Sequence, residues 1–181
     1  MPEHGDIVYQ LNDRDEICFV NKEYDAFATA NDGLNFTSVT VLHRPLWDFI
    51  TDLTTRQLYR DVLILVRRGR PLRFNFRCDS PTCRRLMEMN VGCVDNGAVE
   101  YRVRTITESN RPSQLLLEPN TDRFAELLRV CSWCKMIHVG DGWVEVEDAI
   151  TSLGLFERPT LPAITHGICE QCYQRMIVTL S

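Results

Sequence analysis

The chain has 181 residues, of which 44% are hydrophobic and 25% charged, with a formal net charge of −5 and a pI near 5.4. This composition excludes a disordered or fibrous chain and fits one globular domain with a small additional module. The negative charge excludes a general attraction to nucleic acid or to an anionic membrane, and without a long apolar run or a signal peptide we expect a cytoplasmic protein with no membrane partner.

Short strand and helix patterns open the chain. Residues 7–11 and 16–20 are apolar segments on either side of a polar turn, which predicts a β-hairpin. Asn21 is a capping residue, so we expect a helix over residues 22–30. Apolar side chains at helical spacing predict a longer helix over residues 54–68.

Three segments with period-two patterns follow this helix. Residues 72–78, 85–91 and 98–105 each alternate apolar and polar side chains, and a turn at 95–97 links the last two. Together with the hairpin they predict a five-stranded antiparallel sheet that has one apolar face and one face toward water. The fold class is therefore α+β, with helices packed on one face of the sheet.

Several short stretches resemble the PAS domain, a sensory domain, over roughly residues 5 to 108. These stretches are Ile17-Cys-Phe-Val-Asn21, Leu46-Trp-Asp-Phe-Ile50, Leu63-Ile-Leu-Val-Arg67 with Gly69, and Arg77-Cys-Asp-Ser-Pro81. We expect a short helical turn over residues 46–50. The stretch over residues 77–81 is similar to one in bacterial sensor proteins. The resemblance assigns residues 1–112 to a PAS-like sensory domain.

The same resemblance points to a ligand pocket. His43 and Trp47 lie in a region that lines the cavity of PAS domains. Arg77, Asp79 and Arg85 have two interpretations: an arginine–carboxylate network that fixes the bend after the strand, or a site for a carboxylate or phosphate ligand. We expect neither haem nor flavin, because the 54–68 helix has no histidine and the Asn-Cys-Arg motif of the photoactive flavin type is absent.

Residues 113–130 are predicted to be a linker and a connecting helix. A polar segment bounded by Pro112 and Pro119 precedes Thr121 and Asp122, either of which would cap a helix through Val130. Its apolar stripe offers a surface for dimerisation, and PAS domains commonly form dimers. We therefore expect a homodimer.

Two Cys-x-x-Cys pairs dominate the rest of the chain. They are Cys131-Ser-Trp-Cys134 and Cys169-Glu-Gln-Cys172, with residues 135–168 between them. Each pair presents two sulfur atoms from one turn, so together they supply four tetrahedral ligands. Zinc fits this set best, while iron or a cluster has the same sulfur ligands. The intervening segment is expected to form a turn at residues 140–142 and a helix over 145–153.

Residues 131–181 are thus predicted to be a module held by structural zinc, in which no coordination position is open to water. Its residues are similar to a small module at the end of many bacterial sensor-regulator chains, in the stretches Cys131-Ser-Trp-Cys134-Lys-Met-Ile137, Asp141-Gly-Trp143 and His166-Gly-Ile-Cys169. His166 is expected to donate a hydrogen bond to a ligand or to cap the final helix.

These features predict a non-catalytic bacterial sensory module that acts through contact with a signalling protein. We find no nucleophile beside a base, no paired carboxylates at helical spacing and no glycine-rich phosphate loop, so no enzyme is expected. One alternative is a zinc-ribbon accessory protein for transcription or nucleic acid, although residues 131–181 carry three basic and six acidic side chains. Another is a thiol redox sensor that releases its metal on oxidation.

Overall fold

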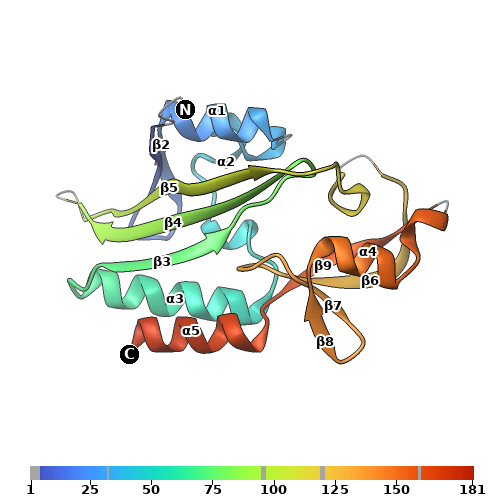
Figure 1. Ribbon diagram of the computed structural model, residues 1–181. Helices are drawn as coiled ribbons and strands as arrows, with labels where there is room; N and C mark the ends of the chain where they lie inside the picture. Colours follow the sequence, from blue (N-terminus) through green and yellow to red (C-terminus); the bar gives the residue numbers. More distant parts are fainter. Residues whose placement is uncertain (1–4, 32, 95–96, 119–120, 159) are drawn as a thin grey trace.

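Two β-sheets form the framework of the protein in the computed structural model, which describes residues 5–31, 33–94, 97–118, 121–158 and 160–181 (Figure 1). The first sheet has five antiparallel strands in the order β2-β1-β5-β4-β3. Its strands are β1 (Ile7–Leu11), β2 (Ile17–Val20), β3 (Leu72–Arg77), β4 (Cys83–Cys93) and β5 (Val99–Asn110). The turn predicted at 95–97 falls mainly outside the described residues.

Helices connect β2 to β3 as the sequence predicts. They are α1 (Lys22–Ala30), η1 (Leu34–Phe36), α2 (Ser38–Val41), η2 (Leu46–Asp48) and α3 (Leu53–Arg67). The Asn21 side chain caps α1 by accepting a hydrogen bond from the Tyr24 N–H, and Asp52 caps α3 in the same way through the Thr55 N–H. Each cap satisfies a backbone donor that the helix itself leaves free.

One face of the five-stranded sheet is buried and the other meets water. Phe74 of β3 and Met89 of β4 are buried on the inner face, where Leu58 and Val62 of α3 pack with them. Arg73, which lies between the buried residues Leu72 and Phe74 of β3, points to the exposed face. This alternation confirms the predicted fold class, which is α+β with helices on one face of a five-stranded antiparallel sheet.

The second sheet belongs to the C-terminal third of the chain and has the order β8-β7-β6-β9. Its strands are β6 (Arg123–Cys131), β7 (Ile137–Val139), β8 (Gly142–Val144) and β9 (Leu161–Gly167). The short helices η3 (Leu115–Leu117), α4 (Val146–Ser152) and η4 (Leu155–Glu157) belong to the same part of the chain, and α5 (Glu170–Leu180) follows β9. Gly140 adopts a left-handed conformation, with φ of 57°, in the β7–β8 hairpin. The predicted turn at 140–142 and the predicted helix at 145–153 are therefore confirmed.

The connecting helix predicted over residues 122–130 is wrong, because this segment is strand β6. It hydrogen-bonds to β7 on one edge and to β9 on the other. Leu128 and Val130 are buried while Leu127 and Arg129 are exposed, which is the period of a strand. Pairing on both edges overrides the helix propensity of the segment. The helical stripe that supported dimerisation does not exist.

The cysteine-bearing turns share a core with the first sheet. The apolar cluster around Tyr101 and Val62 also includes Trp133, Ile168 and Met176. Helix α5 lies alongside α3 and contacts β3 (Figure 1). A smaller second cluster packs α4 on the second sheet. The C-terminal segment is thus built into the surface of the PAS-like part.

Candidate metal centre

The structure brings the four predicted cysteine ligands together. The sulfur atoms of Cys131, Cys134, Cys169 and Cys172 all lie within 4.8 Å of one another. The Cys134 and Cys169 sulfurs are 3.7 Å apart. Tetrahedral zinc with bonds of about 2.3 Å requires about 3.8 Å between sulfurs. The four cysteines are therefore arranged to hold a metal ion.

A tight backbone turn positions the first pair. Cys131 is the last residue of β6, and its C=O accepts a hydrogen bond from the Lys135 N–H at 3.0 Å, while its own N–H donates to the Met136 C=O at 2.8 Å. Lys135 adopts a left-handed φ of 61°, and its ammonium group donates to the Ser132 C=O at 3.0 Å. These bonds reverse the chain so that both sulfur atoms face the same side.

Parallel pairing of β6 with β9 brings the second pair to the first. Cys131 lies opposite Gly167, and the Ser132 N–H donates to the Gly167 C=O at 2.8 Å. Cys169 is the N-cap of α5, and its sulfur accepts a hydrogen bond from the Cys172 N–H at 3.4 Å. The Cys169 N–H donates to the Cys131 sulfur, also at 3.4 Å. Such N–H donors, together with the positive end of the helix dipole, stabilise thiolates.

Because the sulfur atoms lie close together, the pKa values of the cysteine thiols differ strongly from one another. Hydrogen bonds from the Cys134 and Cys172 thiols lower the pKa of Cys131 well below its ordinary value. The Cys131 sulfur raises the pKa of Cys134 to about 12 and strongly raises the pKa of Cys172. A second anion is therefore unfavourable in this cluster unless a cation neutralises it. A divalent metal removes that repulsion and allows every thiol to ionise.

His166 is not the cap of the final helix, because that position belongs to Cys169. It is an exposed residue of β9, opposite Val130 of β6. Across the ranges that the structure describes, no hydrogen bond joins its side chain to a cysteine. The four sulfur atoms form the cluster without it.

Trp133, between the two cysteines of the first pair, makes structural contacts that sequence reasoning missed. Its side chain is only 6% exposed and its ring packs against Tyr59 of α3 and Phe74 of β3, with centroids 5.8 and 6.2 Å apart. Its C=O accepts a hydrogen bond from the Arg77 N–H at 2.6 Å. The large aromatic residue inside the Cys-x-x-Cys motif was the available signal. Trp133 attaches the metal-binding turn to the first sheet.

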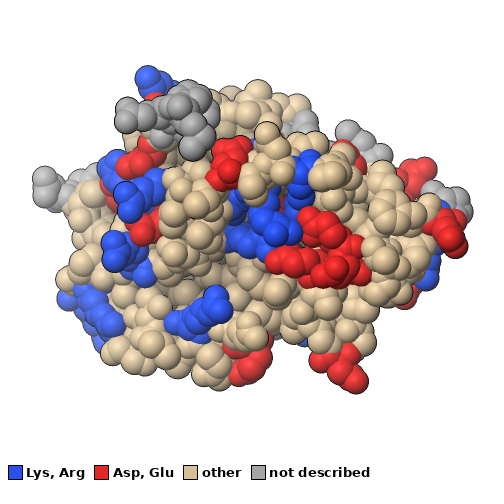
Figure 2. Space-filling view, viewed as in Figure 1, with Lys and Arg blue, Asp and Glu red and all other residues tan. Residues whose placement is uncertain are grey.

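An arginine–carboxylate network forms a second connection between the two parts of the chain. Arg77 donates to Asp79 from Nε and Nη2, and to Glu145 from Nη1 at 2.8 Å. Arg111 contacts Asp79 at 3.3 Å and Glu147 at 3.1 Å. Figure 2 shows basic and acidic side chains meeting near the middle of this face. The network interpretation of Arg77 and Asp79 is confirmed, and it extends to the start of α4, which the sequence did not indicate.

The other residues of the predicted ligand pocket lie apart. His43 is exposed and has a left-handed φ of 64°, and its N–H donates to the Ile17 C=O at 2.8 Å. The Trp47 indole N–H donates to the Asp15 carboxylate at 3.2 Å. Neither residue lies beside Arg77 or Asp79 in the network described above. Arg85 and Asp79 border two different cavities, and a common ligand pocket for the five residues stays a prediction.

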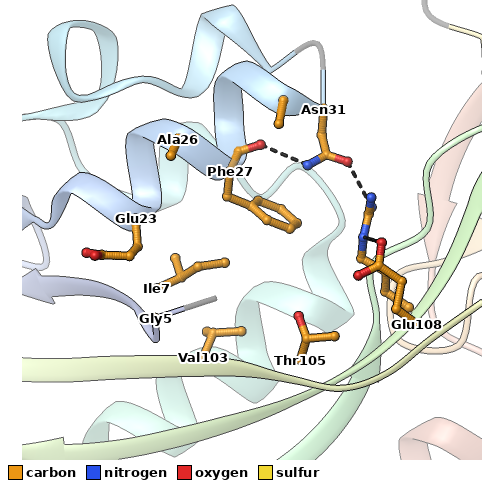
Figure 3. Close-up of a pocket in the computed structure, with 11 residues that line it drawn as sticks. Gly5, Ile7, Glu23, Ala26, Phe27, Asn31, Val103, Thr105 and Glu108 are labelled. Carbon is orange, nitrogen blue, oxygen red and sulfur yellow. Dashed lines mark hydrogen bonds and ion pairs between the residues drawn. The ribbon is translucent and has the colours of Figure 1, made fainter. Parts of the chain in front are cut away.

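Arg85 borders a separate cavity of about 310 Å³ between α1 and β5 (Figure 3). Its guanidinium group donates to Asn31 at 2.8 Å and to Glu108 at 3.3 Å. Phe27 and Val103 give this cavity apolar walls. A larger cavity of about 490 Å³, which Asp79 borders, lies between α1, η1 and the sheet. Binding of a carboxylate or phosphate ligand at either place stays a prediction.

Fold and site define an α+β protein that has a PAS-like five-stranded sheet joined to a four-cysteine module of the kind that can hold a metal ion. No protein-family model matches the chain, and no curated protein matches it. One similar solved structure is described as a sensory box sensor histidine kinase from Vibrio cholerae, with 11% identity and a TM-score of 0.40. The region that the two structures share covers 57% of this chain and 82% of the histidine kinase chain. In the described part of the chain, no helix has the length and apolar character needed to cross a membrane.

The network predicts a pH-dependent contribution to stability from Glu147. Burial raises the pKa of this carboxyl, but hydrogen bonding to its own backbone and the charges of Arg111 and Arg84 outweigh burial and hold the pKa below its ordinary value. The carboxylate therefore stabilises the fold above the unfolded-state pKa of about 4.3, and this stabilisation is lost as the pH falls through the lower folded-state pKa. Glu147→Gln is expected to lower the free energy of unfolding at pH 7 by up to about 1 kcal/mol.

Urea denaturation of both proteins between pH 7 and pH 3.5 checks this expectation. The difference between them should shrink toward the acid end. Glu126→Gln is a matched control, because Glu126 is 68% exposed and its ion pair with Arg158 is long, at 3.7 Å. A difference that stays constant with pH, or an equal effect of the control, would contradict the role of the carboxylate charge.

Proposed function

We propose that this protein is a non-catalytic sensory module, which acts through protein–protein contact and carries one structural zinc ion. The observation that carries the proposal is the convergence of four cysteine sulfurs within 4.8 Å, on turns that share the core of the PAS-like sheet. Zinc, when bound, supplies a redox-inert cross-link and leaves no coordination position for a substrate. A site of this kind stabilises the chain.

Donor chemistry supports zinc as the ion. All four donors are sulfur atoms, three of them buried, and sulfur-only tetrahedral sites select zinc or iron. The chain holds eight cysteines and all of them are free. Free thiols persist in a reducing compartment, and we therefore propose that the protein works in the cytoplasm.

Contact with another protein, including a second copy of this chain, is supported by exposed apolar side chains in the η1–α2 segment. Leu34 is 66% exposed, Phe36 50% and Val39 93%. Apolar groups gathered at a surface are typical of interaction sites. These residues take the place of the helical stripe that the sequence had suggested for a dimer.

Native mass spectrometry of the purified protein tests the proposal, because it reports metal content and oligomeric state together. We expect one zinc ion per chain and a dimer, and Val39→Asp should shift the population toward monomer while the zinc content stays at one. A metal-free chain would contradict the structural zinc. A monomer at high concentration with no co-purifying protein would contradict the contact function.

Two further measurements separate the proposal from its alternatives. Binding of DNA that weakens steeply with salt would favour a nucleic-acid accessory protein instead. Release of zinc by stoichiometric peroxide would favour a thiol redox sensor. We expect neither result, because residues 131–181 carry three basic and six acidic side chains and three of the four ligand cysteines are buried.

A further inference from the structure

A third cavity lies where the metal-binding turn meets the PAS-like part, and it encloses about 310 Å³. The N-terminal turn of α3, strand β3 and the first cysteine turn form its sides. Aromatic rings make up much of its wall, including Phe36, Tyr59, Phe74 and Trp133. Because Trp133 and His166 contribute to the wall, the cavity exists only where the C-terminal segment is docked on the sheet.

Two buried polar atoms on this wall lack a partner. Thr55 and Trp133 are each 6% exposed, and neither the Thr55 hydroxyl nor the Trp133 indole N–H has a hydrogen-bond partner among the described residues. Buried polar groups are nearly always paired, since an unpaired one destabilises the fold. Two such groups on the wall of one cavity indicate a ligand that pairs with both.

The backbones of these two residues are already engaged, which leaves the side chains available. The Thr55 N–H donates to the capping carboxylate of Asp52 at 2.7 Å. The Trp133 C=O accepts from the Arg77 N–H. An indole N–H only donates and a hydroxyl can donate, so one oxygen with two lone pairs satisfies both.

One wall residue also disfavours a negative charge on the ligand. Asp52 borders the same cavity, and its carboxylate disfavours an anion there. Aromatic walls favour a flat apolar body, which stacks on the rings. A neutral aromatic molecule that carries a carbonyl oxygen fits these requirements.

We propose that this cavity binds a small neutral aromatic carbonyl compound, with its oxygen accepting hydrogen bonds from Thr55 and Trp133. This inference rests on the proposed sensory function and gives it a ligand class. Trp133 lies between the ligands Cys131 and Cys134, so an occupant of the cavity touches the turn that holds the metal. Binding is thereby coupled to the geometry of the metal centre.

Acetophenone and ethylbenzene are suitable probes, because they have similar shape and differ in the carbonyl oxygen. The chain has three tryptophans, and Trp133→Phe assigns the Trp133 indole resonance in a ¹H–¹⁵N spectrum by its loss. Millimolar acetophenone is expected to shift this resonance and leave those of Trp47 and Trp143 in place. Ethylbenzene should bind more weakly by a factor of about ten or more, since it accepts no hydrogen bond from Thr55 or Trp133.

Thr55→Val keeps the shape of the side chain and removes its hydroxyl. We expect acetophenone to bind this variant about fivefold more weakly, with ethylbenzene binding unchanged and thermal stability equal or higher. Thr54→Val is the control, because Thr54 precedes Thr55 in the same helix and is exposed. No shift of the Trp133 resonance, equal affinity for both probes, or unchanged acetophenone binding by Thr55→Val would overturn the proposal.

Zinc content measured on the same samples separates the two levels of inference. A protein that holds one zinc ion and binds neither probe would contradict the ligand site alone. A folded protein without zinc would contradict the proposed function whatever the probes do.

Discussion

Replacing Cys169 with serine is expected to release the metal and to lower the free energy of unfolding by at least about 3 kcal/mol, with the midpoint of thermal unfolding falling by about 10 °C. Cys169 has two roles, since it is one of four clustered ligands and also the N-cap of α5. Serine preserves the cap but does not replace a thiolate toward zinc. Loss of stability in this variant therefore reports on the metal.

The effect should extend beyond the cysteine turns. Cys131, Cys169 and Cys172 belong to the same apolar cluster as Leu58 and Tyr101 of the PAS-like part. Near-ultraviolet circular dichroism of the variant, or of the wild type treated with a strong chelator, should change in the signals of buried aromatic residues throughout the protein. Elemental analysis checks the metal in the same samples.

Cys18→Ser is the matched control, because Cys18 is an exposed free thiol on β2. It should keep both the metal and the thermal midpoint of the wild type. A Cys169→Ser protein that unfolds at the wild-type temperature would contradict the structural role of the ion. Loss of metal in the control would show instead that the cysteines act as a common pool.

Trp133→Ala is expected to cost about 3 to 5 kcal/mol while the protein still binds one metal ion. Trp133 is buried against Tyr59 and Phe74, and removing a core aromatic side chain leaves a cavity of corresponding size. The four sulfur ligands remain, because the backbone bonds that shape their turn do not involve the indole ring. Denaturant unfolding together with metal analysis checks both parts.

Trp143→Ala provides the comparison for this variant. Trp143 is half-buried in β8, its ring meets His138 edge-on at 5.1 Å, and it packs at the margin of the apolar cluster in which Trp133 is fully buried. We expect a smaller loss, of about 1 to 2 kcal/mol. If the two variants lost equal stability, Trp133 would not be the attachment that its contacts indicate. Loss of metal from Trp133→Ala would show that the indole supports the ligand geometry directly.

The first sheet could be predicted from the sequence because its signals are local. Residues 72–78 and 99–104 alternate apolar and polar side chains, and the predicted cap Asn21 stands where α1 begins. The cluster of four cysteines could equally be predicted, since two residues between paired thiols suit one tetrahedral ion. These features need only the neighbouring residues to decide them.

Strand β6 shows where local reasoning fails. Phe124, Leu127 and Leu128 are spaced as on one face of a helix, and Ala125 and Glu126 favour that conformation. The strand forms because β7 and β9 supply hydrogen bonds on both edges, and β9 begins 30 residues after β6 ends, at residue 161 against residue 131. No local pattern contains that information.

The extension of the ion network to α4 and the cavity at the first cysteine turn were out of reach for the same reason. Arg77 and Glu145 are 68 positions apart in the sequence, and Arg84 and Glu147 are 63 apart. In the sequence, Glu145 and Glu147 alone look like ordinary exposed charges. Thr55 likewise reads as an unremarkable residue in the first turn of a helix. Docking of the C-terminal segment brings the charged residues into the ion network and places Thr55 on the wall of the cavity.

Parallel pairing of β6 with β9 has a consequence for the order in which the protein matures on the ribosome. A nascent chain that has emerged only through Cys134 presents half of the sulfur donors, and the other half follow after β7, β8, α4 and β9. Until α5 emerges, the side of α3 and β3 that it covers stays open to solvent. Completion of the four-sulfur cluster therefore waits until α5 has emerged, and docking of this helix closes the apolar surface through which an unfinished chain would aggregate.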